Sequence, residues 1–193
     1  MTHKNAKKVD AARQARLRYI AAVSMSVAVV MTFAFVGTYR YGASQAARQN
    51  GTSEVITVNT MGFSPSTGKV IAGAVIPVTL YANSGAQAVN TIQAKVVYDS
   101  SRLQLQSLEE TGVFNQIAAT DTATPGVVQI ARAATGTPLS GTMPVIKLNF
   151  VAKQTVTGSA VLSVDSSASY VVSASTGANI LAGTTTATFT IRR

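Results

Sequence analysis

The sequence contains no cysteine, and histidine occurs once among its 193 residues, as His3. The absence of cysteine excludes disulfide bonds and thiolate metal sites, so an extracellular domain of this chain must rely on its apolar core. The single histidine lies in a basic stretch at the start of the chain. A serine–histidine nucleophile pair and a histidine-rich metal site are therefore excluded elsewhere. We expect no cofactor.

Charged residues are also scarce, at 12% of the chain, while threonine, serine, alanine, valine and glycine dominate. This composition is typical of extracellular β-sandwiches rather than of cytosolic enzymes. Glycoside hydrolysis needs two facing carboxylates. The neighbours Glu109 and Glu110 would point in different directions at a strand end, and we expect them in a solvated loop. The sequence therefore predicts a protein that is not an enzyme.

Acidic residues form no short cluster of the kind that calcium needs, with several oxygen ligands converging on one point. Asp99 is followed by Ser100 and Ser101, whose side chains favour a turn. We predict that the Asp99 carboxylate caps its own turn. No metal site is expected.

The chain has no tryptophan. Carbohydrate-binding sandwiches usually present a flat row of aromatic rings that stack on sugars. Most aromatic residues of the second half occupy inward-looking strand positions, and three lie nearer to loops: Phe63, Phe114 and Tyr170. Because nothing resembles a planar strip, a protein partner is the stronger hypothesis and a polysaccharide is the alternative.

The formal net charge of +9 is unevenly distributed. Residues 1–18 hold six basic residues and one acidic residue, whereas residues 54–193 hold eight basic and six acidic residues. Because the excess adjoins an apolar segment, it indicates membrane topology rather than nucleic-acid binding. We expect no nucleic-acid partner.

The apolar segment is the run Tyr19–Tyr39, which contains no charged residue. As a helix, such a run would reach about 31 Å, which matches the core of a bilayer. We predict a basic cytoplasmic tail over residues 1–18 and a transmembrane signal anchor over residues 19–41. The positive charges before the helix place the N-terminus inside, in a single-pass protein of the cytoplasmic membrane.

Residues 42–53 are small, polar and without periodicity, as expected of a linker. A cleaved signal peptide is the alternative to the anchor, and Ser44–Ala46 would be its cleavage site. Both interpretations place residues 54–193 outside the cell.

Residues 54–193 show short alternating strands separated by glycine and proline, without a helical period or an internal repeat. We predict one all-β domain. The predicted strands are 55–59, 75–82, 89–98, 103–108, 116–119, 127–134, 145–152, 160–164 and 185–191.

Four motifs occur in order along this half: FSPSTGKVIAGAVIPVTLYANS, VNTIQAKVVYDSSRLQLQSL, PGVVQIARAA and GTMPVIKLNFVAKQTVTGSAVLSV. In this order and spacing the half resembles the cohesin module, a relative of bacterial cellulose-binding domains. The resemblance implies a nine-stranded jelly-roll sandwich without catalytic activity. It also implies a dockerin partner, bound on one sheet face at the cell surface.

In the cohesin family, polar residues on the strand before the Tyr-Asp pair touch the partner. The matching positions here are Thr91 and Gln93, with Lys95 further along the same face. A flat polar face would also include residues of two other strands if these are neighbours of the first. The further candidates are Gln129, Ala131, Lys147 and Asn149.

Two other interpretations remain open for this face and this layout. The candidate residues could simply form the solvent-exposed side of a sandwich, without a binding role. Structural subunits of surface filaments share this layout of a short basic segment, an apolar helix and a β domain.

Overall fold

The computed structural model describes residues 55–193. The predicted cytoplasmic tail, membrane helix, linker and cleavage site lie outside this range. No helix within it is long and apolar enough to cross a membrane.

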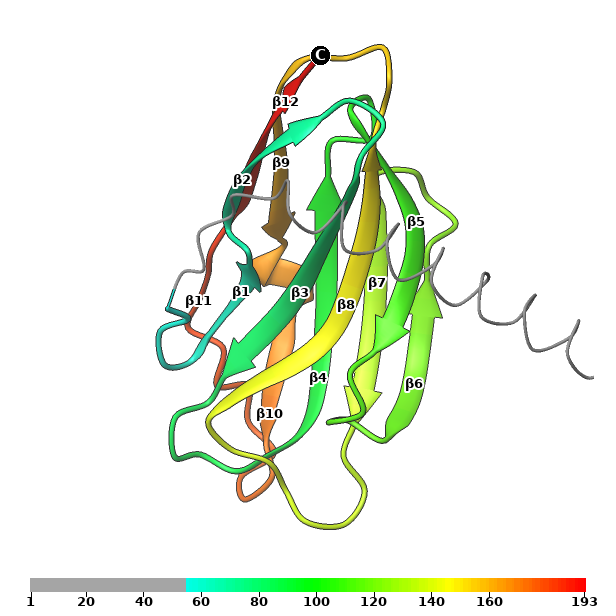
Figure 1. Cartoon of the computed structure of the whole chain (residues 1–193). Helices are drawn as coiled ribbons and strands as arrows, with labels where there is room; N and C mark the ends of the chain where they lie inside the picture. Colours follow the sequence, from blue (N-terminus) through cyan, green and yellow to red (C-terminus); the bar gives the residue numbers. More distant parts are fainter. Residues whose placement is uncertain (1–54) are drawn as a thin grey trace, which may run out of the picture. The chain divides into compact units, whose positions relative to one another are not determined.

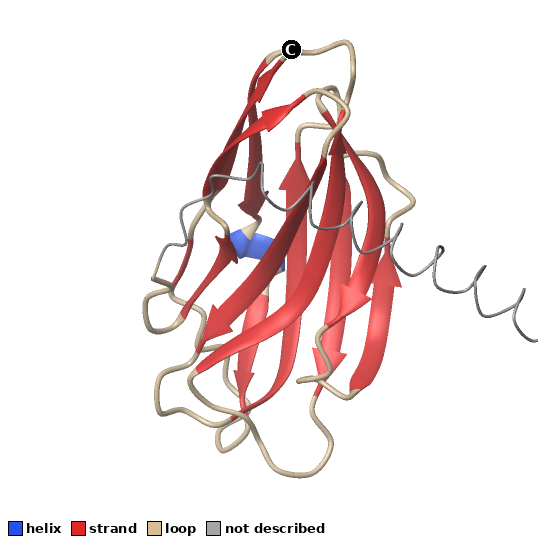
Figure 2. Cartoon of the chain, viewed as in Figure 1, coloured by secondary structure: helices blue, strands red, loops and turns tan. Residues whose placement is uncertain are grey.

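The described residues form a β-sandwich of two sheets, with one short 3-10 helix, η1 (Ser166–Ala168) (Figures 1 and 2). One sheet has five strands in the spatial order β11–β1–β3–β8–β5. Their bounds are β11 (Gly183–Thr184), β1 (Thr60–Ser64), β3 (Val75–Asn83), β8 (Thr142–Ala152) and β5 (Leu103–Glu110). The all-β sandwich predicted from the sequence is confirmed.

The other sheet has seven strands, of which six follow the order β2–β12–β9–β4–β7–β6 and the seventh, β10, pairs with β4. Their bounds are β2 (Thr67–Ile71), β12 (Ala187–Arg192), β9 (Gly158–Val164), β4 (Val89–Tyr98), β7 (Val127–Ala133), β6 (Gln116–Asp121) and β10 (Tyr170–Ser173). The pairs β1–β11 and β2–β12 are parallel, and all other pairs are antiparallel.

The core lies between the sheets and is built by alternation along the long strands. In β3 every second residue from Ile76 to Ala82 is buried, while the residues between them are only partly covered. β8 adds Leu148 and Phe150 from the same sheet, and β4 faces them with Ile92 and other apolar side chains. Each large side chain buried in this way stabilises the fold by about 1.5–3 kcal/mol.

Twelve strands are present in the described part of the chain, against nine predicted. Eight of the predicted ranges match strands, and the four missed strands, β1, β2, β10 and β11, have five, five, four and two residues. The predicted strand at 55–59 is wrong, because Val58 and Asn59 form a turn and Asn59 has a left-handed φ of 58°. The first strand begins one residue later, at Thr60.

The loop aromatics are not a stacking platform. Phe63 and Phe114 are buried in the core, and Tyr170 is half-buried in β10. Although Phe63 and Phe114 lie near loops in the sequence, both side chains belong to the core of the sandwich.

Candidate partner-binding face

Strands β4 and β7 bring five of the seven candidate residues together. In the β4–β7 ladder Thr91 lies opposite Ala133, Gln93 opposite Ala131, and Lys95 opposite Gln129. Ile92, Ala94 and Val96 alternate with the β4 residues and are buried in the core. Thr91, Gln93, Lys95 and Gln129 therefore point outward from the seven-stranded sheet.

We call this outer surface of β10, β4, β7 and β6 the β4–β7 face. It is defined by Thr91, Gln93, Lys95, Gln116, Ala119, Asp121, Gln129, Ala131, Ala133 and Tyr170.

The structure does not place Lys147 and Asn149 on this face. Both lie on β8, in the five-stranded sheet, where Lys147 pairs with Thr79 and Asn149 with Pro77 of β3. The prediction that they share a face with β4 is wrong. Alternation along a strand separates inward from outward residues, but it does not say to which of two sheets the strand belongs.

Gln93 is held in position by β10 and η1. The Tyr170 hydroxyl donates to Gln93 Oε1 at 2.5 Å, and Gln93 Nε2 donates to the carbonyl oxygen of Ala168 at 3.3 Å. The Tyr170 ring and the Gln93 amide therefore form one fixed polar element. Sequence reasoning missed Tyr170 as a face residue, because its position opposite Gln93 depends on a strand that is only four residues long.

Lys95 is paired with Asp165, whose carboxylate Oδ2 lies 3.0 Å from the Lys95 Nζ. Asp165 also caps η1 and accepts hydrogen bonds from the hydroxyl and the backbone N–H of Ser167. The Ser167 hydroxyl and then Lys95 lower the pKa of Asp165 to about 2. The Asp165 carboxylate is thus charged at neutral pH, and it pairs with the Lys95 side chain at the border of the face.

The centre of the β4–β7 face is made of small side chains. In the β6–β7 ladder Gln116 lies opposite Ala133, Ala119 opposite Ala131, and Asp121 opposite Gln129. Every residue of β6 is exposed. A patch of alanines with amide groups around it is suited to close approach by a protein surface.

On the opposite outer face, β5 and β8 satisfy their polar groups between themselves. Lys147 Nζ donates to Glu109 Oε2 at 2.9 Å, and Asn149 Nδ2 donates to Glu109 Oε1 and to the Ser107 hydroxyl. The Lys147 ammonium, and then the Asn149 amide, lower the pKa of the Glu109 carboxyl. Asn149 is only 7% exposed, so little of it is available to a partner.

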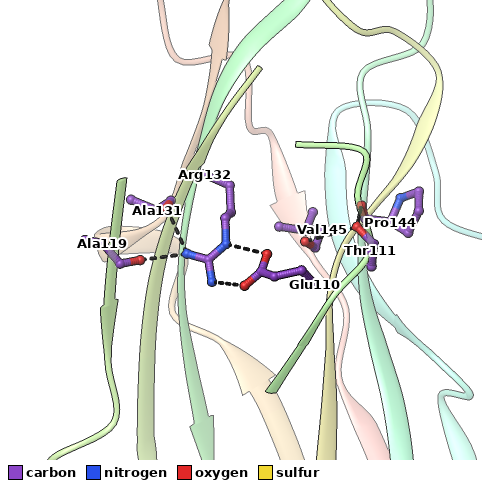
Figure 3. Close-up of polar contacts among 7 residues, drawn as sticks. All are labelled: Glu110, Thr111, Ala119, Ala131, Arg132, Pro144 and Val145. Carbon is purple, nitrogen blue, oxygen red and sulfur yellow. Dashed lines mark hydrogen bonds and ion pairs between the residues drawn. The ribbon is translucent and has the colours of Figure 1, made fainter. Parts of the chain in front are cut away.

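Glu109 and Glu110 point in opposite directions, as predicted, but both lie within strand β5 rather than in a solvated loop. Glu109 faces Lys147 on the outside. Glu110 turns inward and pairs with Arg132 of β7 (Figure 3). The two carboxylates therefore cannot flank one sugar.

The predicted role of Asp99 is confirmed. Its carboxylate accepts hydrogen bonds from the backbone N–H and the hydroxyl of Ser101, and it pairs with Arg102 at 3.0 Å. The Ser101 hydroxyl is the main group that lowers the pKa of Asp99. Residues 55–193 contain no group of three or more side chains with metal-binding geometry.

Comparison with known proteins agrees with this architecture. The sequence model of the cohesin domain family matches residues 63–191. A search of curated proteins gives no match.

Three solved structures illustrate the likeness in fold. A cohesin from Clostridium acetobutylicum has a TM-score of 0.58 at 19% identity, covering 68% of this chain and 90% of that one. The sixth cohesin of scaffoldin B from Acetivibrio cellulolyticus, in complex with a Cel5 dockerin, has a TM-score of 0.60 at 15% identity, covering 69% and 98%. A non-cellulosomal cohesin from the archaeon Archaeoglobus fulgidus has a TM-score of 0.56 at 16% identity, covering 72% and 93%. With the family model matched over most of the β-sandwich, the chain belongs to the cohesin domain family.

Proposed function

We propose that this chain is a non-catalytic attachment module that binds a dockerin through the β4–β7 face. The observation that carries the proposal is the alanine-centred outer surface of β4, β7 and β6, bordered by the Gln93–Tyr170 and Lys95–Asp165 pairs. Cohesins of similar fold have been solved in complex with dockerins, among them the Acetivibrio module and a module from Clostridium thermocellum. These complexes support a protein partner here.

The face fits such a partner physically. Its centre has small side chains that let another backbone approach, and its polar groups are already held in place, so little side-chain entropy is lost on binding. The neighbouring charges of Lys95 and Asp165 largely cancel, which favours recognition by shape and hydrogen bonding over long-range attraction.

We further propose that residues 19–41 anchor the module in the cytoplasmic membrane, with the β-sandwich outside. The uncharged run Tyr19–Tyr39 and the basic residues before it support this topology. Fractionation of cells, followed by intact-mass measurement of the protein, tests it. A mass that begins after Ala46 would instead show cleavage at Ser44–Ala46.

The binding test uses the full chain in detergent and dockerin modules from the organism that produces it. Ala131→Arg places a long charged side chain in the centre of the β4–β7 face and should abolish binding. Thr79→Arg, an outward residue opposite Lys147 in the other sheet, is the matched control and should bind as the unaltered chain does. Equal binding by both variants would show that this face is not the dockerin site.

A further inference from the structure

Arg132 is a charged side chain in the interior of the sandwich. It lies on β7 two residues after the buried Ile130, and its side chain is only 1% exposed. A buried guanidinium carries a large desolvation cost unless its charge and its N–H groups are satisfied. The groups that the guanidinium contacts therefore indicate the role of Arg132.

The guanidinium contacts three strands from two sheets (Figure 3). Nε and Nη2 donate to the two carboxylate oxygens of Glu110 on β5, at 3.0 and 2.7 Å. Nη1 donates to the carbonyl oxygens of Ala119 on β6, at 2.7 Å, and of Ala131 on β7 itself, at 2.9 Å. The fork to Glu110 is bidentate, the geometry in which an arginine–carboxylate pair is strongest.

These contacts join the free edges of the two sheets. β5 is the last strand of the five-stranded sheet, and β6 is the last strand of the seven-stranded sheet. Among the described strands, β6 forms a ladder with β7 only. Because all its residues are exposed, it gains little from apolar burial. The bond from Arg132 to Ala119 therefore adds a side-chain contact from the inner side of the sheet to the β6–β7 ladder.

Ala119 stands at an irregularity of β6. The register of the β6–β7 ladder shifts between Ile117 and Ala119, so an additional residue is accommodated there. Ile117, which lies opposite Arg132 in the ladder, is 59% exposed. The carbonyl oxygen of Ala119, directly after the register shift, accepts the hydrogen bond from Arg132 Nη1.

We infer that Arg132 and Glu110 are positioning residues for the β4–β7 face: together they fix the β6 irregularity and so place Gln116, Ala119 and Asp121. This inference rests on the proposed function only for the consequence to binding. Glu110 orients the Arg132 guanidinium through two hydrogen bonds, and the guanidinium in turn holds the Ala119 carbonyl through a third. Neither residue needs to touch the partner.

Hydrogen exchange of the full chain in detergent tests the positioning role without a partner. Arg132→Met keeps an unbranched side chain but removes the fork, and Glu110→Gln keeps the shape of the side chain but removes its charge. Exchange in residues 116–121 should become at least tenfold faster in both variants, while exchange in residues 187–192 of β12 should increase by no more than the loss of global stability implies. Lys147→Met, which removes an ion pair on the other outer face, is the control and should leave residues 116–121 as they are.

The second readout is the dissociation rate of a dockerin that binds the unaltered chain. We expect Arg132→Met to dissociate at least tenfold faster, and Arg132→Lys to restore less than half of the loss, since a lysine lacks the planar fork. Unchanged exchange in residues 116–121, or an equal increase in all strands, would overturn the positioning role. If no dockerin binds the unaltered chain, the proposed function fails and the exchange experiment still decides the inference.

Discussion

On the outside of the seven-stranded sheet, Lys95 pairs with Asp165 and Gln93 with Tyr170, whereas on the outside of the five-stranded sheet Lys147 pairs with Glu109. The paired polar side chains are of similar kinds on the two outer faces, but their surroundings differ. The first pairs border an open patch of alanines, and their partners come from η1 and β10. Lys147 and Glu109 instead pair across adjacent strands, beside the nearly buried Asn149. An accessible centre, rather than the number of polar groups, distinguishes a surface suited to binding from one that only stabilises its own sheet.

The largest loss of stability should come from the Glu110–Arg132 pair, which lies on the inner side of the β4–β7 face. Glu110→Ala leaves the buried Arg132 charge unpaired and should lower the free energy of unfolding by about 3 kcal/mol. Arg132→Met leaves Glu110, whose side chain is 40% exposed and can be hydrated, so the loss should be about 1 kcal/mol. Urea unfolding followed by circular dichroism measures both. Equal losses would contradict the asymmetry in burial.

Charge reversal on the two faces compares them directly. Lys95→Glu sets two carboxylates side by side at Asp165 and should weaken dockerin binding at least tenfold, which is about 1.4 kcal/mol. Gln93→Ala should act in the same direction. Lys147→Glu is the control on the other face and should leave the affinity unchanged. Calorimetric titration measures the three variants, and a loss confined to Lys147→Glu would move the binding site to the five-stranded sheet.

The ion pairs of both faces should respond to acid in the same direction. The folded-state pKa of Asp165, about 2, lies below its ordinary value of 3.8. Its contribution to stability is therefore complete above about pH 4 and is lost as the pH falls towards 2. Carboxyl carbon NMR should show Asp165 titrating near pH 2, and Lys95→Met should raise that midpoint. A midpoint near 4 in the unaltered chain would rule out the Lys95–Asp165 and Ser167–Asp165 contacts in solution.

The smallest effect is expected at the exposed pair of the five-stranded sheet. Lys147→Met removes the ion pair with Glu109 and should change the free energy of unfolding by no more than about 0.5 kcal/mol, because water screens exposed charges. The same urea unfolding experiment measures it. A loss of more than about 1 kcal/mol would show that this face depends on its polar pairs more than their exposure implies.

Much of the sandwich could be predicted from local sequence. The alternation of β3 and β4 identified both strands, and the bounds predicted for β4 match the structure. The missed strands are those in which local pattern is weak. β2 lies at a sheet edge and buries only Val70, and β11 has two residues that are held by a parallel pairing to β1.

The candidate site could be predicted in part, for a similar reason. Thr91, Gln93 and Lys95 share a strand face, which alternation reveals. Tyr170 and Asp165 lie 70 or more residues further along the chain, and only the pairing of β10 and η1 with β4 brings them to Gln93 and Lys95. The assignment of β8 to the other sheet is likewise a property of the topology, so the alternation of Lys147 and Asn149 along their strand does not show that they lie away from β4 and β7.

The parallel pairing of β2 with β12 has a mechanical consequence. Five residue pairs, from Thr67–Thr188 to Ile71–Arg192, lie side by side in the same direction. A tension that pulls on the start of β2 and on the end of β12 slides the two strands lengthwise past each other. All the hydrogen bonds between them then bear the load at once instead of opening one after another, which is the arrangement that resists traction best.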